Sequence, residues 1–131
     1  SSFIPPRRVY LAGPAFGQSD TVANDWRRLA TAILDAQRVI NPMRRDYRGK
    51  EDLLYMQIVK EDKADIDAAY MLLAYCPIPS AGTSMEIFYA HSQQKPVVIC
   101  AMPPISPWIR YHARVIQPDI LDAILVVRAL L

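Results

Sequence analysis

The sequence predicts an α/β domain of three layers, in which helices cover both faces of a parallel sheet of about five strands. Short, apolar, β-branched segments alternate with longer segments whose apolar residues recur at helical spacing. Proline, glycine or asparagine follows most of the short segments, as is typical where a strand gives way to a loop. The length of 131 residues, of which 52% are hydrophobic and 21% charged, suits a single domain over residues 1–131.

The first half of the chain is predicted to contain two short strands, each followed by a helix. The first strand is apolar and ends at Gly13, and the second ends at Asn41-Pro42. Ser19 or Asp20 is a suitable cap for the first helix, which is expected to end at about Ala36. The two strands are expected over Arg8–Ala12 and Val39–Ile40, and the second helix over Glu51–Ala68.

The second half continues the alternation with three more strands and their helices. Thr83 is the expected start of the helix that follows the third strand, and Pro118 lies near the first position of the last helix, where proline is favoured. The elements are expected over Tyr70–Cys76, Thr83–Gln93, Val97–Ala101, Trp108–Ala113, Val115–Ile116 and Pro118–Leu131.

The loops that follow the strands are the expected place for a ligand. The carboxyl ends of parallel strands meet at one rim, and open α/β sheets bind ligands there. The longest irregular stretch runs from Met43 to Asp52, and loops of this kind often carry function. It holds Arg44, Arg45 and Arg48, each of which is expected to be solvated more often than bound to a phosphate or a base.

A glutamate near a predicted helix start is the strongest candidate for chemistry. Gly82 permits a close approach of backbone to ligand, Thr83 is expected to begin the helix, and Glu86 follows three residues later. This spacing is typical of a capping box, in which the glutamate reaches back to the amide of the cap residue. It also places a carboxylate in the first helical turn, where the helix dipole favours the ionised form that a nucleophile needs.

Two further side chains are expected at the rim. The acidic run from Glu61 to Asp67 lies late in its helix, where most of it suits a solvated face. One of its carboxyl groups is also suited to protonate a leaving base. Tyr10 lies near the end of the first strand, where a phenol either packs in the core or orients a carboxylate.

Composition excludes several classes of function. The net charge is only +2 and the basic residues are scattered, so we expect no nucleic acid polymer as a partner. His91 and His112 lie far apart in the sequence without a paired cysteine or aspartate, so we expect no metal site. The chain lacks a signal peptide and an apolar stretch long enough for a membrane, which favours a cytoplasmic location.

Four segments of the chain resemble a known enzyme family. RRVYLAGP, EDKADIDAAYMLLAY, PSAGTSMEIFYA and KPVVI are similar, in this order and spacing, to the nucleoside 2-deoxyribosyltransferase family. The resemblance implies a flavodoxin-like, or Rossmann-like, fold that needs no metal or organic cofactor. It also implies that Glu86 attacks the anomeric carbon of the sugar, that Tyr10 orients Glu86, and that Asp62, 24 residues before Glu86, helps to protonate the leaving base.

One position departs from family members that act on free deoxynucleosides. Those members carry an aspartate six residues before the nucleophile, where this chain has Ser80. The branch that hydrolyses nucleoside 5'-monophosphates has serine there, and a hydroxyl donates to a phosphate that a carboxylate would repel. The resemblance therefore implies a nucleotide N-glycosidase, which releases the free base and a sugar phosphate through a covalent glycosyl ester on Glu86.

The same branch shares its active site between subunits. A further serine in an S-x-x-I-R setting comes from the neighbouring subunit, and Ser106 to Arg110 resembles that setting with a shorter loop and extra prolines. We therefore expect a homodimer or a higher homo-oligomer. The residues expected to bind a nucleotide or nucleoside substrate are Gly13, Ser80, Gly82, Thr83 and Ser106.

Three other functions stay open at this point. A true transferase would exchange bases on 2-deoxyribose, although Ser80 argues against it. A nucleotide-binding protein without catalysis would keep the pocket, although the intact set of Tyr10, Asp62 and Glu86 argues against it. A flavin-binding or phosphate-receiver domain has little support, because a receiver needs a strand-end aspartate and the first and third strands end in Gly13-Pro14 and Cys76-Pro77.

Overall fold

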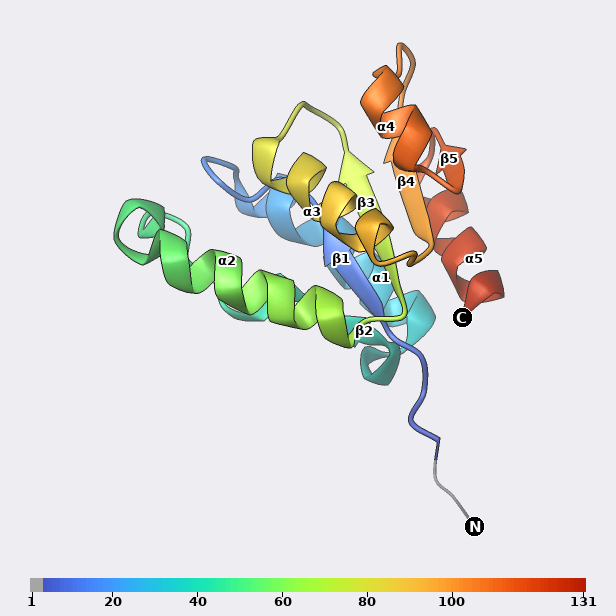
Figure 1. The fold of residues 1–131 in the computed structure, drawn as a ribbon, viewed down its shortest axis with the longest axis horizontal. Helices are drawn as coiled ribbons and strands as arrows, with labels where there is room; N and C mark the ends of the chain where they lie inside the picture. The colour runs from blue at the N-terminus through green and yellow to red at the C-terminus, as the bar shows by residue number, and fades with distance from the viewer. Residues whose placement is uncertain (1–3) are drawn as a thin grey trace.

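A computed structural model describes residues 4–131, which contain a five-stranded sheet with all strands parallel (Figure 1). The strand order is β2-β1-β3-β4-β5, which is the flavodoxin-like order of doubly wound folds. The predicted fold class is therefore confirmed. The strands are β1 (Val9–Ala12), β2 (Val39–Ile40), β3 (Met71–Cys76), β4 (Val97–Ala101) and β5 (Val115–Gln117).

Helices cover both faces of this sheet, as the alternating pattern predicts (Figure 1). The helices α1 (Trp26–Leu34) and α5 (Ile120–Leu130) pack on one face. The other face is covered by α2 (Glu51–Ala68), α3 (Ala81–Ser92) and α4 (Pro107–His112). Each face has its own apolar core, and the two cores lie back to back through the sheet.

The central strands are buried on both faces, because helices lie above and below them. On β1, Val9 and Leu11 pack in the layer of α1 and α5, whereas Tyr10 and Ala12 pack in the layer of α2 and α3. This is the ordinary alternation of a strand. It places the Tyr10 side chain on the same side of the sheet as Glu86.

Three helices begin at different residues from those predicted, and one of them, α4, differs only by beginning at Pro107 instead of Trp108. Ser80, not Thr83, caps α3, because its Oγ accepts a hydrogen bond from the amide of Thr83 at 3.3 Å. The cap of α5 is Asp119, whose carboxylate accepts from the amide of Leu121 at 2.8 Å, so Pro118 lies before the helix. Both cap residues carry a short oxygen side chain that reaches the free amides of the first turn.

The first predicted helix is split into two parts. Residues Thr21–Asp25 form a π-helical turn, η1, that leads directly into α1. The helix α1 ends at Leu34 because Asp35 takes a left-handed φ of 79°. Short 3₁₀ segments, η2 (Ala36–Arg38) and η3 (Pro42–Arg44), then flank β2.

The carboxyl end of β1 is the point where the winding of the fold reverses. Its two neighbours in the sheet are β2 on one side and β3 on the other. Ligands of open α/β sheets bind in the crevice that forms at such a point. Within residues 4–131, none of the helices is long and apolar enough to cross a membrane.

Candidate active site

A cavity of about 180 Å³ lies at the carboxyl end of β1, between α2 and the start of α3. All the predicted site residues except Ser106 line it. Four different parts of the fold contribute these side chains, because β1, the loop after it, α2 and α3 converge at this rim. The predicted residues in its wall are Tyr10, Gly13, Asp62, Ser80, Gly82, Thr83 and Glu86.

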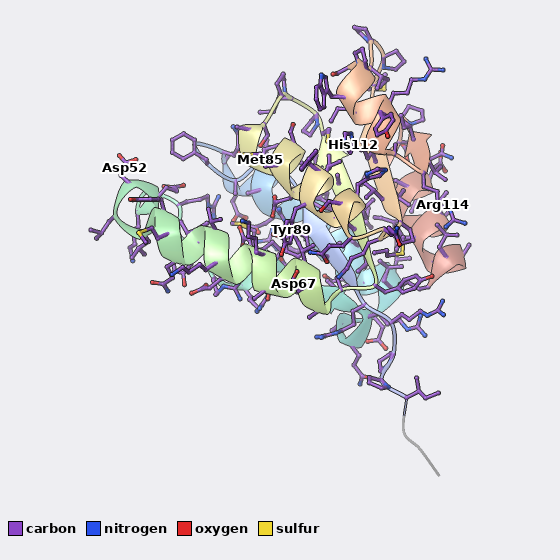
Figure 2. The ribbon with its side chains drawn as sticks, viewed as in Figure 1. Asp52, Asp67, Met85, Tyr89, His112 and Arg114 are labelled. Atoms are coloured by element: carbon purple, nitrogen blue, oxygen red, sulfur yellow. The ribbon has the colours of Figure 1, made fainter. Side chains whose placement is uncertain are left out.

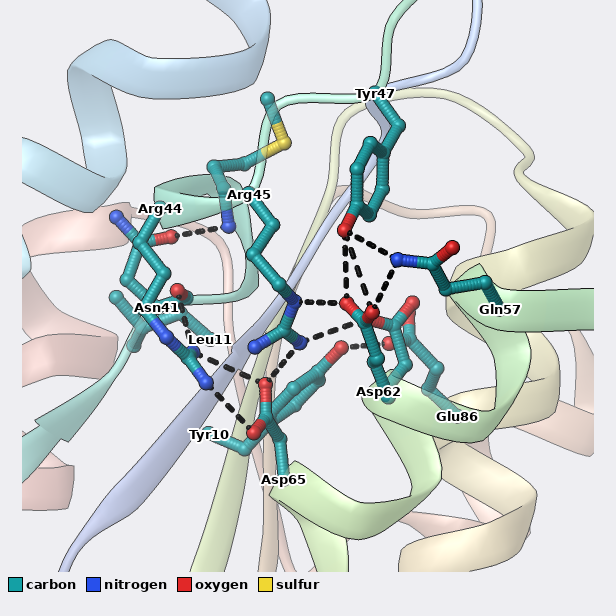
Figure 3. A network of polar contacts seen from close by, with 12 residues as sticks. Tyr10, Leu11, Asn41, Arg44, Arg45, Tyr47, Gln57, Asp62, Asp65 and Glu86 are labelled. Carbon is teal, nitrogen blue, oxygen red and sulfur yellow. Dashed lines mark hydrogen bonds and ion pairs between the residues drawn. The ribbon is translucent and has the colours of Figure 1, made fainter. Parts of the chain in front are cut away.

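Tyr10 and Glu86 form the centre of the site. The Tyr10 hydroxyl donates a hydrogen bond to Oε2 of Glu86, which joins β1 to α3 across 76 residues of sequence (Figure 3). Tyr10 is fully buried, and Glu86 is partly buried and lines the cavity. Burial and the neighbouring Glu86 and Asp62 carboxylates raise the pKa of Tyr10 far above its usual value, so the phenol stays protonated and can only donate to Glu86.

The expected position of Glu86 in the first helical turn is wrong. Because Ser80 caps α3, Glu86 lies in the second turn. A capping box between Thr83 and Glu86 is therefore not formed. The benefit of the helix dipole falls off after the first turn, so it gives Glu86 little help in ionising.

The electrostatics of Glu86 also differ from the expectation of a readily ionised carboxylate. Burial, together with repulsion from Asp62, raises the pKa of Glu86 to about 8. The hydrogen bond from Tyr10 and the positive charge of Arg27 act in the opposite direction. Functional sites typically contain a carboxyl group that lines a cavity and can hold a proton at neutral pH.

Asp62 is the second carboxyl group in the cavity wall (Figure 3). Burial raises its pKa to about 6, although the charge of Arg45 lowers it. Two interacting carboxyl groups titrate as a pair, so Asp62 and Glu86 together bind one proton near neutral pH. Such a pair can supply an acid and a nucleophile at the same time.

The other acidic residues near the end of α2 are held by the loop before that helix. The guanidinium of Arg45 forms an ion pair with Glu61, contacts Asp65 at 2.6 Å and lies 3.7 Å from Asp62 (Figure 3). Arg44 binds the far side of Asp65 at 2.8 Å. The expectation of a solvated acidic face is therefore wrong for these residues, because the arginine loop folds back over them.

Asp67 is the exception in this acidic run, because it points away from the cavity. Its carboxylate accepts a hydrogen bond at 2.8 Å from the hydroxyl of Tyr89 (Figure 2). It accepts another at 2.8 Å from the side-chain amide of Gln93, and both donors lie outside the cavity wall. Asp67 therefore fits the structural role that was expected for most of the run.

Sequence reasoning missed Arg27, and it underrated Arg45 and Arg48. All three line the cavity. The signal for Arg27 was present, because it falls on the helical stripe of Ala23, Ala30 and Leu34, which faces the sheet. A charged residue on a buried stripe is rare unless it is paired, so it marks a site of interest.

The start of α3 supplies hydroxyl and amide groups to the cavity. Oγ of Ser80 accepts a hydrogen bond from the Thr83 amide at 3.3 Å and one from the Thr83 hydroxyl at 3.0 Å. At Gly82, an added methyl group would meet no protein atom within 4 Å, so this edge of the cavity is open to a ligand. At Gly13, a methyl group would lie 2.7 Å from the Trp26 ring, so Gly13 is required for packing.

Ser106 lies outside this cavity. It lines a second cavity of about 520 Å³ between α3, α4 and the loops that follow β3 and β4. Its Oγ caps α4 by accepting from the amide of Trp108 at 3.3 Å. Ser80 and Thr83 line both cavities, so the start of α3 is the wall between them.

Comparison with known proteins gives one family. The sequence model of the family described as "Domain of unknown function (DUF4406)" matches residues 7–99, which include β1 to β3, the first part of β4, Arg27, Asp62 and Glu86. No curated protein matches the chain.

Proposed function

This chain belongs to the DUF4406 family, and from the geometry of its site we propose that it cleaves the N-glycosidic bond of a nucleoside 5'-monophosphate. The single observation that carries the proposal is the carboxylate of Glu86, which faces a cavity at the rim of the sheet while Tyr10 holds it from below. The second carboxyl group, Asp62, lies in the same wall. Paired carboxyl groups at a cavity are the usual equipment for glycosidic cleavage.

The proposed reaction has two steps. Oε of Glu86 attacks C1' of the sugar as the C1'–N bond breaks, and the electron pair of that bond leaves with the base. Asp62 gives its proton to the base, and a glycosyl ester on Glu86 results. Water, deprotonated by Asp62, then attacks C1' and releases Glu86, so the sugar phosphate forms with net retention.

Between about pH 6 and pH 8 the carboxyl pair holds one proton, and the pKa values of about 6 for Asp62 and about 8 for Glu86 place it mostly on Glu86. Attack requires an ionised Glu86, and departure of the base requires a protonated Asp62. The reaction therefore proceeds through the less populated form, in which Asp62 holds the proton. Below about pH 6 both groups carry protons, and above about pH 8 neither does. We therefore expect a bell-shaped dependence of kcat/KM on pH with its maximum between these two values.

The position of Ser80 supports a phosphate at the 5' end of the substrate. A cavity of about 180 Å³ is smaller than typical small-molecule sites of roughly 300–1,000 Å³, so a nucleotide must extend beyond it. Ser80 and Thr83 line both this cavity and the second one, so they lie on the side where the substrate can extend. Hydroxyl groups and the free amides at the start of α3 are suitable donors for a phosphate.

One assay tests the proposal against its rivals. Nucleosides and their 5'-monophosphates, each with ribose or 2-deoxyribose, are incubated with the protein and free base is measured by chromatography. Release of base from the monophosphates, lost in Glu86→Gln, is the expected result. Faster exchange with an added second base than hydrolysis would identify a transferase, and tight binding without base release over hours would identify an inactive binder.

We also propose that the protein works as a homodimer. Three large apolar side chains beside the second cavity are exposed, since Phe88, Trp108 and Tyr111 have exposed fractions of 55%, 73% and 74%. Contiguous apolar surface of this kind usually marks an interface. We propose that Ser106 of the second copy then contacts the 5'-phosphate.

Mixing two inactive proteins tests the shared site. Ser106→Ala is expected to reduce, and Glu86→Gln to abolish, base release from a monophosphate. If Ser106 acts across the interface, hybrid dimers contain one site with both native residues, so mixing restores part of the activity. Purely additive activity, or a monomer in light scattering, would contradict the shared site.

A further inference from the structure

Arg27 is a buried cation that the proposed reaction does not yet use. It lies on α1 with an exposed fraction of 2%, although arginine is almost never fully buried unless it is paired. It reaches past the carboxyl end of β1 and enters the wall of the cavity that holds Glu86. The guanidinium therefore links the helix layer that contains α1 to the layer that contains α3.

Its hydrogen bonds fix the backbone at the end of β1. Nη2 donates to the carbonyl oxygens of Leu11 at 3.3 Å and Gly13 at 3.1 Å, and Nη1 donates to the carbonyl of Ala23. Leu11 and Gly13 flank the exit of β1, directly after Tyr10. Among the described residues, Nε of Arg27 has no hydrogen-bond partner.

Carbonyl groups alone do not neutralise a buried cation. Removing a charge from water costs several kcal/mol, and an opposite charge nearby is the usual compensation. Two carboxyl groups from two elements supply it, Glu86 of α3 and Asp62 of α2, while Arg48 opposes them. Burial lowers the pKa of Arg27 to about 10, with Glu86 the largest opposing influence, so the guanidinium remains charged at neutral pH.

We propose that Arg27 is a positioning residue for the proposed glycosidic cleavage, which holds the end of β1 in place and supplies a positive charge that favours the ionised form of Glu86 for attack. The inference rests on the proposed function for its role in the reaction. Charge interactions are reciprocal, so a carboxylate that stabilises the buried guanidinium is stabilised by it to the same extent. Arg27 therefore favours the form of the carboxyl pair in which the proton is on Asp62 rather than on Glu86.

The conservative and neutral variants separate the charge from the hydrogen bonds. In Arg27→Gln the charge is lost and the pKa of Glu86 rises, so we expect the basic limb of kcat/KM to move about one pH unit or more toward higher pH and its maximum to fall. In Arg27→Lys the charge is kept but the forked hydrogen bonds are lost. We expect its basic limb to stay within about half a unit of that of the wild type, with a reduced kcat.

Arg28→Gln is the matched control, because Arg28 is the next residue and forms exposed ion pairs with Asp20 and Asp25. We expect an unchanged basic limb in this variant. A purely structural clamp predicts that Arg27→Gln and Arg27→Lys lose activity equally at every pH, and that result overturns the proposal. If Arg27→Gln does not fold, Arg27→Lys is the deciding variant. A shift of its basic limb of kcat/KM by one pH unit toward higher pH would contradict a role for the charge.

A titration without catalysis separates this inference from the proposed function. In protein with ¹³C-labelled glutamate, the carboxyl signal absent from Glu86→Gln reports the protonation of Glu86. We expect its midpoint to rise by about one unit or more in Arg27→Gln and to stay unchanged in Arg28→Gln. No base release from wild type refutes the proposed function, whereas an unmoved Glu86 midpoint in Arg27→Gln refutes the inference about Arg27.

Discussion

The two cavities beside the start of α3 differ in chemistry more than in position. The smaller one, at the end of β1, is lined by Tyr10, Arg27, Asp62 and Glu86, which titrate or carry charge. The larger one is lined mostly by apolar side chains and hydroxyl groups, with His112 as its charge-bearing candidate. Ser80 and Thr83 belong to both.

The larger cavity is therefore the less suitable place for bond cleavage. Volume alone favours it, since it is about 520 Å³ against about 180 Å³. A cleavage reaction, however, needs groups that attack and that transfer protons, and only the smaller cavity combines them within the described residues. The comparison teaches that an aromatic, open surface is suited to binding, whereas closely packed ionisable groups are suited to chemistry.

The most severe test of this division is Glu86→Gln. The amide cannot attack C1', so we expect base release to fall by more than about a thousandfold with the fold intact. The rate on the best substrate of the panel measures base release, and a circular dichroism spectrum checks that the fold is intact. Asp52→Asn, an exposed change near the start of α2 (Figure 2), is the control and should retain full activity. Undiminished turnover in Glu86→Gln would remove the nucleophile from the mechanism.

A smaller loss is expected in Asp62→Asn, because it removes the proton donor and leaves the nucleophile. We expect a decrease of about a hundredfold in base release from natural nucleotides. A substrate with an activated leaving group needs no proton, so its cleavage should be nearly unaffected. Asp67→Asn on the same helix is the control, since Asp67 binds Tyr89 outside the cavity. An equal loss on both substrates would assign Asp62 another role.

The wall between the cavities can be tested with Ser80→Asp. A carboxylate there would repel a 5'-phosphate, so we expect kcat/KM for monophosphates to fall by roughly thirtyfold, or about 2 kcal/mol. The value for free nucleosides should hold or rise. Competition assays with matched nucleoside and nucleotide measure the ratio of the two kcat/KM values. Ser92→Asp, at the far end of α3 and outside both cavities, controls for added charge. An unchanged ratio would separate Ser80 from phosphate recognition.

The smallest expected effect concerns stability. Burial raises the pKa of Glu86 from its usual 4.5 to about 8, so between these pH values the folded protein holds a proton that the unfolded chain releases. The contribution of Glu86 to the free energy of unfolding is therefore lost as pH rises through this window. We expect Glu86→Gln to be more stable than wild type at pH 8 by on the order of 1–2 kcal/mol, with little difference near pH 4.

Urea denaturation at about pH 4, 6 and 8 measures this difference. The gap between variant and wild type should widen steadily with pH. A gap that narrows with pH would mean that Glu86 is ionised in the folded protein without cost, which contradicts its buried position beside Asp62.

Most of the fold was predictable because local patterns carry it. The spans Glu51–Ala68 and Val97–Ala101 agree with the prediction at both ends, since hydrophobic periodicity and punctuation by proline or glycine are local signals. The predicted start of α3 was wrong because Ser80 and Thr83 are both acceptable cap residues. Only the geometry of the turn after Pro79 selects Ser80.

The sequence predicted which residue types form the site, but it did not predict which charged groups surround them. Tyr10, Asp62 and Glu86 were named from a motif, and they line one cavity as expected. Arg27 was missed as a site residue and Arg45 was underrated, because their partners lie on other elements. Likewise, His91 and His112 are 21 positions apart in the chain, yet their rings pack with centroids 4.7 Å apart beside the larger cavity.

The amino-acid sequence by itself determined the parallel, doubly wound fold and the candidate attacking carboxylate, because both depend on spacing along the chain. Only the tertiary structure decided which groups surround that carboxylate and which protonation state they favour. The physical reason is that a pKa depends on burial and on charges within a few ångströms, and those charges come from β1, α1 and α2, which are distant from Glu86 in sequence.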